Sequence, residues 1–130
     1  MEEAKELMIQ DYAKQTLVLR TYLRTRGFYN ALKAMEYGLS YHTNIRKDGQ
    51  PEFSHQVSQA CLFMTIDSNA LFTEETYICI FLHDLPEDYQ EVSINLIREK
   101  FGIVAGDAVG IMCKVHSDIE NKLSNGYYYQ

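Results

Sequence analysis

The sequence predicts an all-α protein, a compact bundle of about six helices in one domain. Apolar residues recur every three or four positions through most of the chain, which is the spacing of one helix face. The segments between these stretches are short and carry Gly, Pro, Asp or Asn. No pair of alternating segments supplies the strands of a sheet, and 130 residues suit a single domain with its own core.

The first two helices are expected over residues 2–26 and 29–41. Good helix formers dominate the first segment, and Gly27 is a suitable residue to end it. The side chains expected to face the core are Leu7, Tyr12, Leu19 and Leu23 in the first helix, and Leu32, Met35 and Leu39 in the second.

Residues 42–53 read H-T-N-I-R-K-D-G-Q-P-E-F, and the pair Asp48-Gly49 followed by Pro51 predicts a loop. The helical pattern then resumes near Ser54. The residues of this third helix expected to face inward are Val57, Cys61 and either Met64 or Leu62.

Thr73 is expected to cap a fourth helix, because acidic residues follow it in the first turn. The next residues, T-Y-I-C-I-F-L, are ambiguous, since β-branched and aromatic residues also favour strands. We interpret them as helix because of the capping signal and because no partner strand is predicted elsewhere. Pro86 prevents a regular helix from continuing through Leu85.

Two more helices complete the predicted bundle. Ser93 can cap a short helix that runs to Phe101, and Gly102 can end it. A further apolar helix is expected over residues 104–115.

The composition excludes several classes of protein. A net charge of −6 without a basic face argues against binding nucleic acid through its phosphates. No apolar stretch reaches membrane-spanning length, and the charged amino terminus lacks a signal sequence, so a cytoplasmic protein is expected. The three cysteines have no C-x-x-C spacing and are expected to be reduced residues of the core.

A cluster of polar residues follows the fourth helix and indicates a metal site. His83 and Asp84 are adjacent at a helix end, and His55 begins the preceding helix. Imidazole and carboxylate ligands together suit Mn, Fe or Zn. An isolated H-D pair is more often an incidental, solvent-exposed helix end, so the residues alone leave both interpretations open.

Two other groups gain a role if a metal binds here. Glu87 and Asp88 lie just after Pro86 and could exchange a proton with a water molecule, or else form an ordinary solvated turn. Arg46 and Lys47 could bind a phosphorylated ligand, or else belong to an ordinary polar loop.

Three blocks of the chain, in order, resemble one family. They are R-K-D-G-Q-P-E-F-S-H, then H-D-L-P-E-D, then F-G-I-V-A-G-D-A-V-G-I-M-C-K. They resemble the hydrolase domain of RelA/SpoT-type alarmone enzymes, which belong to the HD superfamily of metal-dependent phosphohydrolases. The resemblance covers about residues 34–114, with Ala34, Tyr37 and His42 loosely compatible upstream. It implies one HD-type domain over residues 1–130, with residues 1–28 forming an extra amino-terminal helix.

The resemblance implies an all-α enzyme of the stringent response that binds one Mn²⁺ and removes the 3′-pyrophosphate of ppGpp or pppGpp, giving GDP or GTP. His55, His83 and Asp84 would be its metal ligands. Glu87 and Asp88 would be catalytic, through the attacking water and proton transfer. The substrate-binding residues would be Arg46, Lys47 and Asp48, with Arg46 against the guanine.

The chain departs from the family pattern in three places. Glu52 replaces the usual aromatic residue, and Pro86 replaces an aliphatic one. A later K-x-A-D-R/K-x-x-N block, which carries a fourth metal ligand, has no counterpart; Asp118 and Asn121 come too early to be that pair. The chain is therefore expected to be a truncated or impaired hydrolase. The alternatives are an inactive HD-fold protein that acts through interaction or self-association, and a phosphohydrolase for another nucleotide.

Overall fold

Seven helices make up the part of the chain that this computed structural model describes, namely residues 2–45, 47, 49–67 and 70–124. Side chains are described for residues 11–45, 47, 49–67 and 70–114. The helices are α1 (Glu2–Thr25), α2 (Tyr29–Tyr41), α3 (Ser54–Ile66), α4 (Glu74–Leu82), α5 (Leu85–Asp88), α6 (Ile94–Phe101) and α7 (Ile103–Ser124). Within these residues the only extended pairing is an isolated bridge between Ile45 and Pro51, so the all-α prediction is confirmed.

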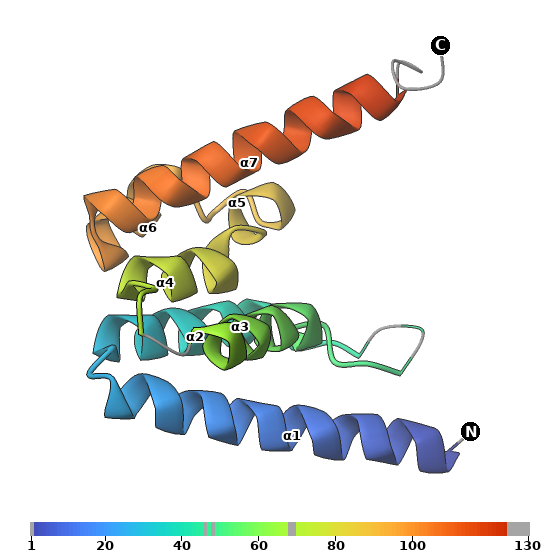
Figure 1. The fold of residues 1–130 in the computed structure, drawn as a ribbon. Coiled ribbons are helices and arrows are strands. Elements are labelled where there is room, and N and C mark those ends of the chain that lie inside the picture. Colours follow the sequence, from blue (N-terminus) through green and yellow to red (C-terminus); the bar gives the residue numbers. More distant parts are fainter. Residues whose placement is uncertain (1, 46, 48, 68–69, 125–130) are drawn as a thin grey trace.

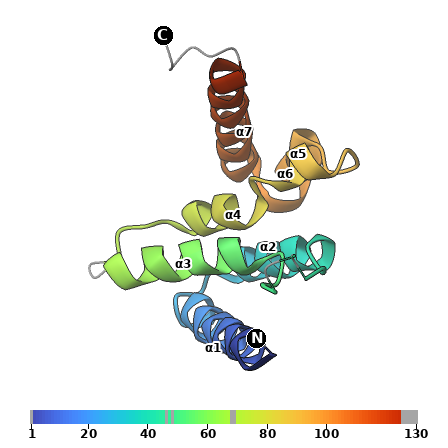
Figure 2. The ribbon, with the colours of Figure 1, turned by 90° about the vertical axis from the view of Figure 1, so that its right-hand side faces the viewer.

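The helices are stacked in successive layers (Figure 1). Helix α1 packs on α2 and α3, and α4 covers α2 and α3 from the other side. Helix α7 packs on α4 and α6, at the end of the stack opposite α1 (Figure 2). The junction between α4 and α5 therefore lies near the loop between α2 and α3, which is how segments far apart in sequence meet at one cleft.

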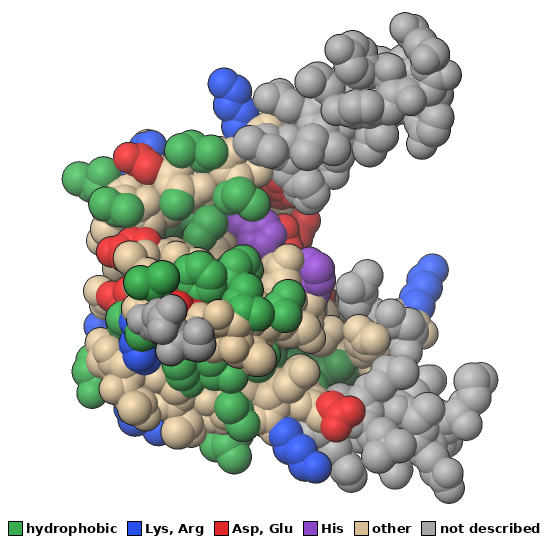
Figure 3. Space-filling model, viewed as in Figure 1, with side chains coloured by type: hydrophobic (Ala, Val, Ile, Leu, Met, Phe, Trp, Pro, Cys, Tyr) green, Lys and Arg blue, Asp and Glu red, His purple; other side chains and the backbone are tan. Residues whose placement is uncertain are grey.

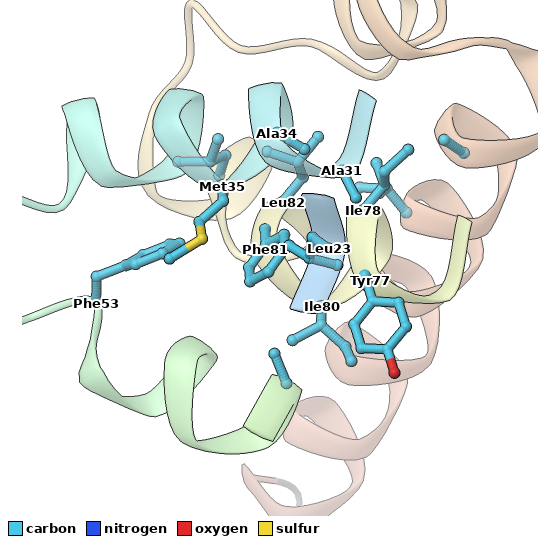
Figure 4. Close-up of a cluster of buried hydrophobic side chains, with 14 of the residues drawn as sticks. Leu23, Ala31, Ala34, Met35, Phe53, Tyr77, Ile78, Ile80, Phe81 and Leu82 are labelled. Carbon is cyan, nitrogen blue, oxygen red and sulfur yellow. The ribbon is translucent and has the colours of Figure 1, made fainter. Parts of the chain in front are cut away.

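The core lies between α2, α3 and α4 (Figure 4). Its largest members are fully buried aromatic and aliphatic side chains, among them Phe53, Tyr77 and Phe81. Leu19 and Leu23 of α1 and Met35 of α2 are also fully buried, as their spacing predicted. Among the positions of α3 that were predicted to face inward, only Val57 is fully buried. Leu62 is 61% exposed.

Local signals fix several helix ends. Gly27 and Gly102 follow α1 and α6 with φ of 73° and 103°, a backbone region that favours glycine. Ser93 caps α6, since its hydroxyl accepts a hydrogen bond from the Leu96 amide at 3.1 Å. Thr73 precedes α4 as predicted, but its side chain makes no capping bond to the helix backbone.

The fourth helix ends before Pro86, as predicted, and a short helix that was not predicted follows it. Helix α4 ends at Leu82, and the chain turns at His83 and Asp84. Pro86 then lies in the first turn of the short helix α5, where its missing N–H is not needed. The break brings the polar residues of this segment to the end of a buried helix.

The remaining predictions concern the last helix and the cysteines. Helix α7 runs from Ile103 to Ser124, beyond the predicted end at residue 115. Cys61, Cys79 and Cys113 are free thiols of intermediate exposure, and burial raises the pKa of each. Among the described residues, no helix combines the length and apolarity needed to cross a membrane.

Candidate functional site

A cleft of about 410 Å³ lies where the loop after α2 and the start of α3 face the α4–α5 junction. Figure 3 shows histidine and acidic side chains together at a hollow of the molecular surface. The residues lining the cleft are His42, Asn44, Ile45, Glu52, His55, Gln56, Asp84 and Asp88. Three of the predicted site residues, His55, Asp84 and Asp88, thus share one cleft, whereas His83 is not among the residues that line it.

His83 is oriented by the end of α4. Its Nδ1 lies 3.2 Å from the Cys79 carbonyl oxygen and 3.1 Å from that of Ile80, while Nε2 lies 3.1 Å from Asp84 Oδ1. Both ring nitrogens therefore face acceptors, although a neutral imidazole has only one N–H donor. The positions of Nε2 and Oδ1 are compatible with a direct contact between the two side chains or with a cation that both of them bind.

The Asp84 carboxylate is held from two sides. Besides His83 at Oδ1, Gln56 donates its Nε2–H to Asp84 Oδ2 at 2.7 Å. Gln56 belongs to α3 and is only 3% exposed, so this bond joins α3 to the α4–α5 junction inside the protein. The Oε1 atom of Gln56 is buried and has no hydrogen-bond partner among the described residues.

A buried histidine fastens the loop that borders the cleft. His42 Nδ1 lies 3.0 Å from Glu52 Oε1, and the Glu52 amide donates to the Asn44 carbonyl at 2.8 Å. The His42 ring stacks on Phe53 and meets Tyr89 edge-on. His42 and Glu52 thus hold the two ends of this loop together at its base, beside Asp84 and Asp88.

The two predicted catalytic acids have different surroundings. Asp88 lines the cleft; partial burial raises its pKa, the negative charge of Asp84 raises it further, His42 lowers it and Glu52 raises it. Glu87 does not line the cleft, and its charge contributes to raising the pKa of Cys113 on α7 to about 11, mainly an effect of burial. Asp88 is therefore the acid that can act on a ligand in this cleft.

The predicted substrate-binding residues lie in the loop between α2 and α3. Lys47 is exposed, and Arg46 and Asp48 lie outside the described residues. Their neighbours Asn44 and Ile45 line the cleft, so this loop forms one of its walls.

The donor atoms fit a divalent cation in part. His83 Nε2 and Asp84 Oδ1 converge, and the bonds from His83 Nδ1 to backbone carbonyls are typical of a metal-binding histidine. His55 lines the same cleft as Asp84 but is exposed. Among the described residues no three His, Cys, Asp or Glu side chains are already arranged to hold one ion.

Five residues that line the cleft were not predicted as members of the site: His42, Asn44, Ile45, Glu52 and Gln56. Glu52 was noticed only as a departure from a family pattern, and His42 only as loosely compatible with it. Gln56 follows His55 directly and carries no signal of its own. The contacts of these residues reach across the fold, which spacing along the chain does not reveal.

Comparisons with known proteins identify no relative. No protein-family model matches the chain, and no curated protein or solved structure is similar to it.

Proposed function

We propose that this protein is a metal-dependent phosphohydrolase of the HD type, which hydrolyses the 3′-pyrophosphate of ppGpp or pppGpp to give GDP or GTP and pyrophosphate. The observation that carries the proposal is the arrangement of His83. Its Nε2 lies 3.1 Å from Asp84 Oδ1 while its Nδ1 faces backbone carbonyls, next to a cleft of about 410 Å³. This is the arrangement expected of a histidine that shares a cation with a carboxylate.

His83 and Asp84 would hold Mn²⁺, together with His55 from the start of α3. When bound, the ion would supply a Lewis acid and positive charge for hydrolysis of the phosphate ester. The proposal assigns these roles on donor chemistry, since imidazole nitrogen and carboxylate oxygen both suit Mn²⁺.

The charge of the cleft explains why a phosphohydrolase here would need a cation. Glu52, Asp84 and Asp88 all line it, and the charges of the first two raise the pKa of the third. Such a cleft repels a pyrophosphate group unless positive charge is added. Lys47 is exposed on the loop whose residues Asn44 and Ile45 line the cleft, and it would offer a point charge for phosphate.

Asp88 is the residue best suited to handle a proton. Its raised pKa lies closer to neutral pH than the pKa of an ordinary aspartate, which favours proton transfer to and from a ligand. In the proposed reaction a water molecule would attack the phosphorus bonded to the 3′ oxygen. As the bond from phosphorus to the 3′ oxygen breaks, Asp88 would donate its proton to that oxygen and be reprotonated by the proton that the attacking water loses. Glu87 stays a predicted second acid, although it does not line the cleft.

The test is release of pyrophosphate from ppGpp by the purified protein with Mn²⁺, compared with Asp84→Ala. We expect release above background from the wild type and its loss in the variant. Equal, background-level release from both proteins would contradict the proposed activity. Running GTP and ATP beside ppGpp would show whether the site acts on another nucleotide.

A second candidate function is binding of another copy of the chain, with or without catalysis. The observation in its favour is a row of exposed apolar side chains on α7. Ile103, Val104, Ile111 and Met112 are 71%, 66%, 65% and 45% exposed. Analytical ultracentrifugation of the wild type and Ile111→Lys separates the cases: a dimer lost in the variant supports self-association, and a wild-type monomer contradicts it.

A further inference from the structure

We propose that Gln56 is a positioning residue of the candidate metal centre: its side-chain amide fixes the carboxylate of Asp84 in the orientation that binds the cation. The inference rests on the proposed function, because it assumes that Asp84 is a metal ligand. It assigns a role to a residue of α3 that does not itself need to touch the ion or the substrate.

The contact between Gln56 and Asp84 is short and enclosed. Gln56 Nε2 lies 2.7 Å from Asp84 Oδ2, and the glutamine is 3% exposed. The amide nitrogen must face the carboxylate, since two acceptor oxygens at this distance would repel each other. A hydrogen bond to a charged group inside the protein is stronger than one between neutral groups.

The oxygen of the same amide shows that this orientation of Gln56 lowers the stability of the fold. Gln56 Oε1 is buried without a hydrogen-bond partner among the described residues. Leaving such an acceptor unpaired lowers the stability of the fold, a loss that an apolar residue at position 56 would avoid. A buried polar group of this kind calls for an explanation. Its bond to Asp84 provides one.

The two contacts of Asp84 together fix the plane of its carboxylate. Gln56 binds Oδ2 from α3, while Oδ1 faces His83 Nε2 at the end of α4. A carboxylate has about four lone-pair sites, so the bond from Gln56 leaves acceptor capacity for a cation. Loss of such an outer contact typically weakens metal binding about 10- to 100-fold.

The experiment is a titration with Mn²⁺, monitored by the electron paramagnetic resonance signal of the free ion. Gln56→Met keeps an unbranched side chain of similar length but removes the N–H donor. We expect it to weaken Mn²⁺ binding roughly 10- to 100-fold relative to the wild type. The visible spectrum of bound Co²⁺ should also change, because the carboxylate ligand is no longer held in one orientation.

Two further variants distinguish loss of the Gln56–Asp84 hydrogen bond from a general effect of substitutions in α3. Gln59→Met makes the same change on the same helix at a residue outside the cleft, and it should bind Mn²⁺ like the wild type. Gln56→Asn retains the amide but is one methylene shorter, so it should also bind more weakly. Thermal unfolding with EDTA verifies that each variant folds, and the comparison uses the folded ones.

The outcomes are distinct. Wild-type affinity and an unchanged Co²⁺ spectrum in both Gln56 variants, together with weaker binding in Asp84→Asn, would overturn the role of Gln56 and leave the proposed function standing. Failure of the wild type itself to bind Mn²⁺ or Co²⁺ would overturn both proposals. Weaker binding in both Gln56 variants and in Asp84→Asn, with Gln59→Met binding like the wild type, would support the inference.

Discussion

The apolar core and the polar cleft lie against each other but are built in opposite ways. Phe53, a fully buried core residue, connects the two: its ring stacks on Phe81, with ring centres 6.1 Å apart, and on His42, which lines the cleft, with ring centres 5.9 Å apart. On the Phe81 side, large side chains are fully buried with apolar neighbours. On the His42 side, polar atoms are buried without complete hydrogen bonding.

The difference shows that, in the described part of the chain, buried polar atoms without hydrogen-bond partners, which lower the stability of the fold, are found mainly at the cleft. Five buried side-chain atoms lack hydrogen-bond partners within the described residues, and three of them line the cleft: His42 Nε2, Glu52 Oε2 and Gln56 Oε1. Each unpaired atom costs about 1–3 kcal/mol. Unpaired buried polar atoms are expected at functional sites. Here they lie beside a core of fully buried apolar side chains, which supplies the stability that they cost.

The largest effect should come from the core side of this boundary. Phe81→Ala removes a fully buried ring that packs on Phe53, and we expect it to lower the free energy of unfolding by about 3–5 kcal/mol. Urea unfolding followed by circular dichroism measures this. Leu71→Ala, at a 77% exposed position, should change it by less than about 0.5 kcal/mol. Similar effects of the two changes would contradict the assignment of the core.

Gly38 tests how closely the core and the loop approach each other. An added Cβ would lie 2.8 Å from a Phe53 ring carbon and 2.9 Å from the Phe81 carbonyl oxygen. Such overpacking costs about 1–3 kcal/mol, and the better helix propensity of Ala returns about 1 kcal/mol. We therefore expect Gly38→Ala to destabilise the protein by roughly 1 kcal/mol.

Gly110 offers the matched control for this substitution. Its added Cβ would meet only Ile94 side-chain carbons, at 3.6 and 4.0 Å, which are ordinary contacts. Gly110→Ala should therefore stabilise the protein by up to about 1 kcal/mol in the same urea experiment. Equal stability changes in Gly38→Ala and Gly110→Ala would mean that the close approach at Gly38 is absent.

The smallest effect concerns the charge of the cleft. The raised pKa of Asp88 means that the folded state binds its proton more tightly than the unfolded state. Its contribution to stability therefore falls as pH rises from the ordinary value of about 3.9 through the raised pKa. We expect Asp88→Asn to raise the melting temperature at pH 7 in EDTA, and the gain to vanish below about pH 3.9.

Glu99→Gln controls for the loss of one negative charge, since Glu99 is exposed on α6 and does not line the cleft. A gain of the same size in Glu99→Gln, or a lower melting temperature of Asp88→Asn at pH 7, would contradict the account of Asp88.

The part of the fold that the sequence predicted well depends on local signals. Gly27, Ser93 and Gly102 end or begin helices where they were expected to, because their conformational or capping preference acts on neighbouring residues. The inward face of α3 was harder to predict. Apolar residues lie on most sides of this helix, so its pattern did not distinguish buried Val57 from exposed Leu62.

The candidate site likewise contains some contacts that the sequence could predict and others that it could not. His83 and Asp84 are neighbours in sequence, so their proximity could be predicted. The Gln56–Asp84 bond joins residues 28 positions apart, and the His42–Glu52 pair closes a loop between positions 10 apart. These contacts depend on how α3 packs beside α4 and on the path of the loop, which no local pattern encodes.

We propose that Asp84, which lines the cleft, and the adjacent His83 hold a metal ion. The most direct test is X-ray diffraction from crystals of the protein soaked in Mn²⁺, with data collected on both sides of the manganese absorption edge. We expect one anomalous peak within coordination distance of His83 Nε2 and an Asp84 carboxylate oxygen. A peak elsewhere, or no peak at saturating Mn²⁺, would contradict this proposal.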